Sequence, residues 1–209
     1  MHPAFSVIFF TVTSGAGYGL MALLCLFNFL YLGMLFDKNI FLIFSGISAV
    51  LFTMGLISST FHLANPKNAW RAFMRFRTSW LAREGLLAIL FYPTLFLYLL
   101  LIHLDFYKDY FLLMQIYSVF IFFFAILIIY CTGMIYACLK TIPQWNTPWT
   151  PINYITIGIY LGGLIFFSAL VAPSVFTSLD EKNARVFLRS IFPKLYLFAG
   201  IFSLFISLI

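Results

Sequence analysis

Long runs of apolar residues that contain no charged side chain make up most of the chain. They are Met1–Phe36, Asn39–Pro66, Gly85–Leu104, Tyr110–Leu139, Thr141–Leu179 and Leu195–Ile209. A helix needs about 20 apolar residues to cross a hydrocarbon layer of about 30 Å. The first five runs are long enough to cross, whereas the last is too short, so we expect the chain to stop inside its final helix.

These runs predict an all-α fold, an integral membrane helical bundle with about six transmembrane helices, the last one truncated. The composition agrees, because 64% of the residues are hydrophobic and only 9% are charged, against about a quarter charged in soluble domains. No basic stretch precedes the first apolar run, so we expect a retained helix rather than a cleaved signal peptide. The predicted spans are Phe5–Phe36, Ile40–Phe61, Gly85–Leu104, Phe111–Leu139, Asn153–Val171 and Leu195–Ile209.

The segment TSGAGYGL in the first span contains three glycines spaced two apart. Gly15 and Gly19 match the G-x-x-x-G pattern, in which small residues let two helices approach closely. A nucleotide-binding loop is excluded, because no strand precedes the glycines and no lysine follows them. We therefore predict close helix packing at Gly15 and Gly19.

Basic residues gather between the second and third spans. Asn65 and Pro66 form a helix-start signal, and the following residues place aromatic side chains on one face and Arg71 and Arg75 on another. This predicts a surface-lying amphipathic helix over Lys67–Trp80. An interfacial linker that binds acidic lipid headgroups is the alternative. As candidate docking residues for a soluble partner we take Trp70, Arg71, Arg75, Arg77 and Trp80.

Charge counting does not orient the bundle. With six spans, the two sides of the membrane receive equal numbers of Lys and Arg residues in their connecting segments, so the positive-inside rule gives a tie. Most of the basic residues on the side opposite the N-terminus come from one long connection, 172–194. The tie indicates either that one basic loop serves function rather than topology, or that the last fifth of the chain is a separate module.

His62 and Glu84 stand on either side of the basic segment. His62 ends the second predicted span and Glu84 begins the third, so both emerge at the same membrane face. An imidazole beside a carboxylate can accept protons and hydrogen-bond a quinol hydroxyl. The alternatives are an ordinary interface histidine and a Glu84 that pairs with Arg83 or Arg77.

Other redox groups are disfavoured by position. Haem held by two histidines needs both imidazoles at similar depth, but His103 ends the third span on the face opposite His62, so we expect no haem. The three cysteines, Cys25, Cys131 and Cys138, lack a C-x-x-C pattern, so we expect no iron–sulfur cluster in this chain and assign them as small core residues. We identify no metal ligands and no catalytic residue of this chain's own.

Three stretches carry a family resemblance: HPAFSVIFFTVTSGAGYGL, GLISSTFHLANPKNAWRAFMRFRTSWLAREG and CTGMIYACLKTIPQWNTPWTP. In this order they resemble the membrane anchor subunit of dimethyl sulfoxide reductase, the anchor-C family. The resemblance implies a haem-free bundle that oxidises menaquinol and passes electrons to an iron–sulfur electron-transfer subunit, which feeds a molybdopterin catalytic subunit. The family's quinol-site histidine in the HL-x-x-P motif falls on His62, and its glutamate in the S-W-L-x-R-E motif falls on Glu84.

The resemblance covers roughly residues 1–155, with about five matching spans where the family typically has eight. Residues 156–209 instead resemble a small uncharacterised family of bacterial membrane proteins with a VAP-x-x-F…FP-x-x-Y pattern. We therefore divide the chain into a quinol-oxidising anchor-like domain, 1–155, and a C-terminal transmembrane hairpin of uncertain origin, 156–209.

An anchor subunit of an oxidoreductase in the bacterial inner membrane is thus the favoured hypothesis, with the lipid bilayer and soluble redox subunits as partners and no nucleic acid. A structural or assembly membrane protein without redox chemistry is the first alternative. A transporter is the second, and it is disfavoured because no Asp, Glu, Lys or Arg lies in the middle of a predicted span.

Overall fold

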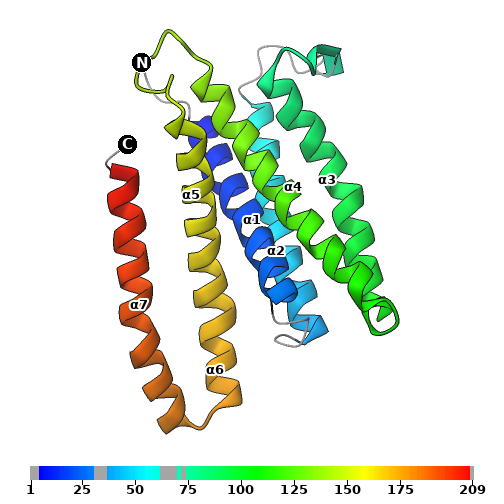
Figure 1. Cartoon of the computed structure of the whole chain (residues 1–209), viewed down its shortest axis with the longest axis vertical. Coiled ribbons are helices and arrows are strands. Elements are labelled where there is room, and N and C mark those ends of the chain that lie inside the picture. Colours follow the sequence, from blue (N-terminus) through cyan, green and yellow to red (C-terminus); the bar gives the residue numbers. More distant parts are fainter. Residues whose placement is uncertain (1–4, 31–36, 62–69, 72–73, 208–209) are drawn as a thin grey trace.

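A computed structural model describes residues 5–30, 37–61, 70–71 and 74–207, and in these ranges the chain forms helices and connecting turns. Figure 1 shows the long helices lying side by side, with the direction of the chain reversing at each connection. The helices are α1 (Phe5–Leu30), α2 (Lys38–Thr60), α3 (Trp80–His103), α4 (Phe111–Ala137), α5 (Trp149–Ile165), α6 (Ala172–Ser178) and α7 (Glu181–Ser207). A 3₁₀ turn, η2 (Phe106–Lys108), precedes α4, and a π-helical segment, η3 (Phe166–Val171), joins α5 to α6.

The predicted helical membrane bundle is confirmed. Within the described ranges, five helices are long and apolar enough to cross a membrane: α1, α2, α3, α4 and the continuous element Trp149–Thr177 that runs through α5, η3 and α6. The sequence predicted about six, the last of them at 195–209. That stretch belongs to α7, which is not among the five.

The connection predicted at 172–194 is helical, which corrects the sequence assignment. Its one break lies at Leu179, whose backbone is extended. The next residue, Asp180, accepts hydrogen bonds from the Ala184 N–H and the Asn183 side chain, and so starts α7. At about 1.5 Å per residue, the element from Trp149 to Thr177 is about 43 Å long, longer than a hydrocarbon layer of about 30 Å. The element is therefore long enough to tilt within the apolar layer or to project beyond it.

The third span begins earlier than predicted. Ser79 has an extended backbone and its hydroxyl accepts a hydrogen bond from the Ala82 N–H, so it caps α3 and Trp80 becomes the first residue of that helix. In the described part of the predicted surface helix, 3₁₀ turns cover 70–71 and 74–75, and a turn at 76–78 leads to Ser79. The amphipathic helix predicted to extend to Trp80 is therefore wrong at its C-terminal end.

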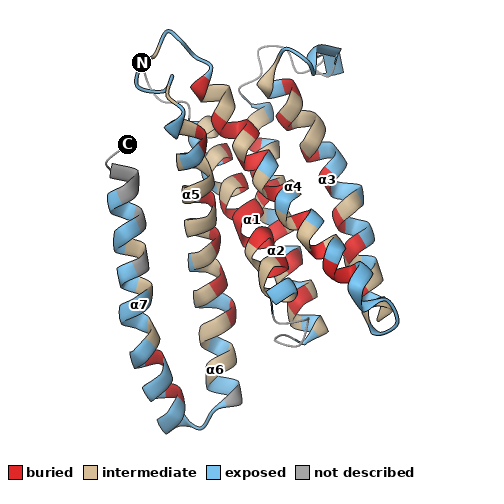
Figure 2. Cartoon of the chain, viewed as in Figure 1, coloured by how far each residue is buried: buried red, intermediate tan, exposed pale blue. Residues whose placement is uncertain are grey.

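The first helix is the centre of the bundle. In its most apolar 18-residue stretch 56% of the residues are buried, against 22–39% in the other four spans. Figure 2 shows the buried positions on α1 and on the faces of the neighbouring helices that surround it. Cys25 and Cys131 lie in the core as predicted, whereas Cys138, which caps the end of α4, is exposed.

Glycines allow α1 to touch its neighbours backbone to backbone. A Cβ atom built on Gly19 would lie 1.9 Å from the carbonyl oxygen of Gly158 in α5, and one built on Gly162 would lie 2.3 Å from the Leu20 nitrogen. Gly15 faces the same helix, since a Cβ atom built on it would lie 3.8 Å from Gly158 Cα. The prediction of close packing at Gly15 and Gly19 is confirmed, and its partner is a second G-x-x-x-G pair, Gly158 and Gly162.

The opposite side of α1 meets α2 in the same way. A Cβ atom on Gly17 would lie 2.6 Å from the Phe52 nitrogen, and one on Gly55 would lie 2.8 Å from Ser14. The Ser48 hydroxyl donates a 2.8 Å hydrogen bond to the Gly17 carbonyl oxygen across this contact. The two-residue spacing of the α1 glycines thus serves two different neighbouring helices.

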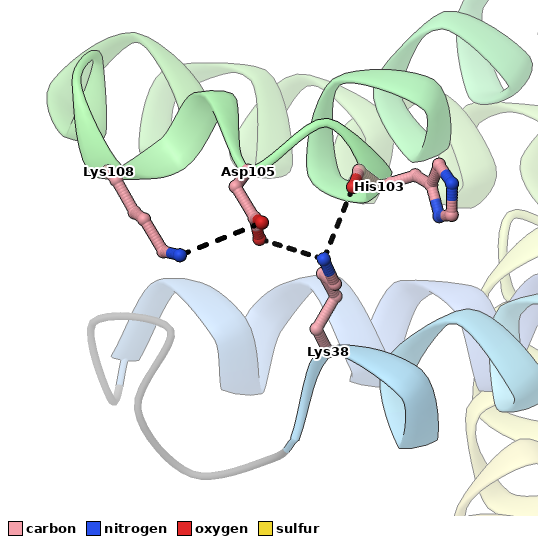
Figure 3. Close-up of polar contacts among 4 residues, drawn as sticks. All are labelled: Lys38, His103, Asp105 and Lys108. Atoms are coloured by element: carbon pink, nitrogen blue, oxygen red, sulfur yellow. Dashed lines mark hydrogen bonds and ion pairs between the residues drawn. The ribbon is translucent and has the colours of Figure 1, made fainter.

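Polar contacts hold the bundle at the end away from the N-terminus. Lys38 at the start of α2 forms a 2.9 Å ion pair with Asp105, donates to the His103 carbonyl oxygen at 3.2 Å, and shares Asp105 with Lys108 (Figure 3). The hydrogen bond from Lys38 is the main cause that lowers the pKa of Asp105 below its ordinary value. In the same region the Asn28 amide donates to the Tyr98 hydroxyl at 2.8 Å, joining α1 to α3.

We predict that Gly19→Ala weakens the bundle, because the new methyl group cannot fit against the α5 backbone. Overpacking of this kind costs roughly 1–3 kcal/mol or more, which unfolding of the purified chain in detergent would measure. Gly46→Ala is the matched control, since its Cβ meets nothing within 4 Å. That variant should be neutral or stabilised by up to about 1 kcal/mol through helix propensity. Equal stabilities for the two variants would contradict the proposed contact.

Candidate functional site

Glu84 lies inside the bundle rather than at its surface. It is the fifth residue of α3, about 6 Å from the helix start at 1.5 Å per residue, and only 4% of it is exposed. Its Oε1 is hydrogen-bonded to the hydroxyl of Thr132 on α4. Thr132 precedes the end of α4 by five residues, so the two polar groups lie at matching depth beneath the same end of the bundle.

Thr132 has two acceptors for one proton. Its Oγ1 contacts Glu84 Oε1 and also lies 3.1 Å from the carbonyl oxygen of Ile128, one turn back in α4. A hydroxyl group carries a single hydrogen but can accept as well. When Glu84 is ionised, Thr132 donates to the carboxylate; when Glu84 is protonated, it can donate to Thr132 while Thr132 donates to Ile128. The Thr132 hydroxyl can therefore reorient when Glu84 gains or loses a proton.

A cavity of about 200 Å³ lies on the other side of Thr132, between α1, α4 and α5. Gly15 and Gly158 form part of its wall, so the close contact of α1 with α5 borders the cavity directly. Val12, also in the wall, is 44% exposed and marks an edge toward the outside of the bundle. The lining residues are Thr11, Val12, Ser14, Gly15, Tyr18, Ile129, Thr132, Tyr154, Ile157 and Gly158.

Two aromatic residues, Tyr18 and Tyr154, line this cavity, and each packs against further rings. The Tyr18 ring stacks on Phe52 with 4.8 Å between centroids and meets the edge of Phe91 at 5.4 Å. On α5, the Tyr154 ring stacks at 5.1 Å on Tyr136 near the end of α4. The cavity thus combines hydroxyl groups with flat apolar surfaces, the lining that aromatic ligands with a few polar atoms require.

The predicted docking residues divide into two groups. Trp70, Arg71, Arg75 and Arg77 are exposed at the end of the bundle where α3 begins. Trp80 is half-buried: the Arg83 guanidinium lies 4.1 Å from its ring centroid, while Tyr130 meets it edge-on.

Arg83 fastens the preceding turn to α3. Its guanidinium donates to the carbonyl oxygens of Phe76 at 3.1 Å and Arg77 at 2.7 Å. In the described part of the chain Glu84 forms no ion pair, and its hydrogen bond goes to Thr132. The alternative of a Glu84 paired with Arg83 or Arg77 is therefore wrong.

His62 falls outside the described residues, so its proximity to Glu84 stays a prediction. His103 ends α3 at the opposite end of the bundle and is exposed. Sequence reasoning missed Thr132, Tyr18 and Tyr154. Thr132 lies in the stretch CTGMIYACLK, and counting residues from the ends of two antiparallel helices would have put it at the depth of Glu84.

Comparison with known proteins identifies the family. A family model described as "DMSO reductase anchor subunit (DmsC)" matches residues 1–206. The chain belongs to this anchor family. It is a multi-pass membrane protein, as its five spans require. The chain is similar to the C subunit of a sulfite dehydrogenase from Allochromatium vinosum, with 32% identity over 180 residues that cover 79% of this chain and 54% of the relative. No solved structure matches.

The anchor spans about half the length of the curated relative it matches. The family match includes residues 156–206, which the sequence pattern assigned to a C-terminal hairpin of uncertain origin. The division at residue 155 stays a prediction.

We predict that Thr132→Val destabilises the anchor by about 1–3 kcal/mol, because it leaves the buried Glu84 carboxyl without its hydroxyl partner. Thr132→Ser keeps the hydroxyl and should retain most of the stability. Thr94→Val is the matched control, since that hydroxyl bonds only carbonyl groups of its own helix. Unfolding midpoints of the three variants in one detergent measure the difference, and a Thr132→Val no worse than Thr94→Val would show that the contact contributes nothing.

Proposed function

We propose that the chain is the membrane anchor of an oxidoreductase complex in the bacterial inner membrane, and that it oxidises menaquinol. Electrons pass from the quinol to an iron–sulfur electron-transfer subunit and from there to a molybdopterin catalytic subunit. The observation that carries the proposal is the buried Glu84 carboxyl, hydrogen-bonded to Thr132 in the wall of a cavity. Membership in the anchor family supports it.

The chemistry of quinol oxidation suits this arrangement. Two O–H bonds break, and the ring gives up two electrons and two protons as it becomes a quinone. Thr132 can pass one proton from a ring hydroxyl in the cavity to Glu84, because its own hydroxyl turns between two acceptors. His62 is the proposed acceptor of the second proton, on the strength of its motif. Proton acceptors of this kind contribute about 10²–10⁴-fold to rate.

The size of the cavity limits what it can hold. A cavity of about 150 Å³ in another protein binds benzene, so about 200 Å³ accommodates one aromatic ring or little more. The oxygen-bearing ring of the quinol would lie inside. Its isoprenoid tail would leave past the exposed edge at Val12.

The docking surface lies above the same end of the bundle. We define it as the exposed residues Trp70, Arg71, Arg75 and Arg77 together with Trp80. Trp and Arg are enriched among the few interface residues that carry most of the binding energy. An iron–sulfur subunit bound here would stand at the end of the bundle where α3 begins, close to Glu84.

A second candidate function is quinone reduction at the same site, the reverse of the proposed quinol oxidation. The relative, which is named as part of a sulfite dehydrogenase, suggests a complex that delivers electrons to the membrane. Quinone reduction takes up two protons and two electrons, so Glu84 and Thr132 would supply a proton instead of accepting one. Comparing quinol oxidation with quinone reduction by the assembled complex decides between the two directions.

We predict that Glu84→Gln and His62→Ala each lower quinol oxidation by the assembled complex at least 10²-fold, because each removes a proton acceptor. Oxidation of menadiol, a tail-less naphthoquinol, in reconstituted membranes measures the rate. Asp105→Asn is the matched acid-to-amide control at the opposite end of the bundle and should leave the rate unchanged. Normal oxidation in the Glu84→Gln variant would refute the role of Glu84 in the quinol site, whereas no oxidation by the unaltered complex would favour a structural or transport role.

We predict that the double change Arg71→Glu and Arg75→Glu releases the soluble subunits from membranes, because it reverses the charge of the docking surface. Sedimentation of membranes followed by detection of the soluble subunits measures retention. The control is Lys182→Glu with Arg189→Glu, which reverses two exposed basic residues near the opposite end. Full retention in the first variant would exclude the docking role.

A further inference from the structure

Tyr18 carries a buried hydroxyl group without a partner. The residue is 2% exposed and lines the cavity, and within the described part of the chain its OH has no hydrogen-bond partner. Buried tyrosine hydroxyls usually find a partner, since burying an unpaired one costs free energy. Stacking on Phe52 and edge contact with Phe91 hold the ring on two sides, so the OH cannot easily turn away to find one.

The other hydroxyl groups that α1 contributes to the cavity are already committed. Ser14 donates to the Phe10 carbonyl oxygen at 2.6 Å, and Thr11 donates to carbonyl oxygens of its own helix at 3.0–3.1 Å. Both can still accept a hydrogen bond but have no hydrogen to offer a ligand. On this wall Tyr18 is therefore the group able to donate to a carbonyl oxygen.

We propose that Tyr18 is a positioning residue that donates a hydrogen bond to one ring oxygen of the bound quinone. The inference rests on the proposed function and deepens it. Tyr18 on α1 and Thr132 on α4 belong to different walls of the same cavity, so the ring is held with one oxygen at Tyr18 and the other at Thr132. Positioning adds no bond-making step, and both quinol protons leave by the acceptors already proposed.

The arrangement suits both redox states of the ring. A quinone oxygen can only accept a hydrogen bond, and Tyr18 offers the donor that it needs. A quinol hydroxyl both donates and accepts, so Tyr18 can bond it as well. Tyr18 therefore orients the ring in both directions of the reaction without changing its own protonation.

The test measures binding of menadione, labelled with ¹³C at its carbonyl carbons, to the full chain in lipid nanodiscs. In Tyr18→Phe we expect the Kd to rise about tenfold, the loss of one hydrogen bond. One carbonyl stretching band should move to higher wavenumber while the other stays in place. The stability of Tyr18→Phe should be unchanged or higher, because the lost hydroxyl has no partner within the described protein.

Tyr98→Phe is the matched control. This tyrosine is equally buried but accepts a hydrogen bond from Asn28 at the far end of the bundle. The Tyr98→Phe variant should be less stable than the unaltered chain, but its Kd for menadione and both carbonyl bands should be unchanged. An unchanged Kd and unchanged bands in Tyr18→Phe would overturn the inference while leaving the proposed function standing, if Glu84→Gln still abolishes turnover. Failure of menadione to bind the unaltered chain would overturn both.

Discussion

The contact of α1 with α5 is the constraint on which the site depends. With a Cβ position on Gly19 only 1.9 Å from the Gly158 carbonyl oxygen, no side chain can separate the two helices there. In a lipid environment this closeness is the main source of helix association, because lipid tails are as apolar as the side chains and provide little hydrophobic drive. Gly17 and Gly55 also bring α2 into close contact with α1 on the other side. The central helix is thereby fixed in rotation and in height.

Because the rotation of α1 is fixed, the side chain of Tyr18 is held at the wall of the cavity. Gly15, Tyr18 and Gly19 lie on one stretch of the helix, so the residues that allow close approach adjoin the tyrosine that faces the cavity. Small residues at Gly15 and Gly158 also leave space beside the contact instead of filling it. At the far end, Asn28 and Lys38 form hydrogen bonds and an ion pair that hold α1 and α2 against α3 and its following turn. Packing thus leaves the cavity lined by Tyr18 and Thr132 toward the end of the bundle where Glu84 lies.

The sequence predicted the helices well where apolar runs are bounded by charge, and it predicted close packing at Gly15 and Gly19 because the spacing is a direct geometric signal. It failed at Ser79 and at 172–194. A single side-chain cap decides where α3 starts, and an amphipathic charged helix has the composition of a loop in a membrane protein. Glu84 could be picked out as a lone carboxylate, and the family motif assigned it to a quinol site. Thr132 and Tyr18 could not, since threonine and tyrosine are common in membrane helices and only the packing of α1, α3 and α4 shows which of them meet.

The position of the site also bears on the proposed electron transfer. Glu84 lies about 6 Å from the start of α3 and Thr132 about 7–8 Å from the end of α4, and both of these helix ends lie at the same end of the bundle as the docking surface. A quinol oxidised at this depth stands close to the face where the soluble subunit is proposed to bind. Electrons need not cross the bilayer inside the anchor, so the geometry does not require a redox centre within the chain. Protons accepted by Glu84 in the proposed reaction would have their shortest exit on the same face. Proton release and electron transfer would then occur on one side of the membrane, and the direction of turnover would be set by the partner subunits rather than by the anchor.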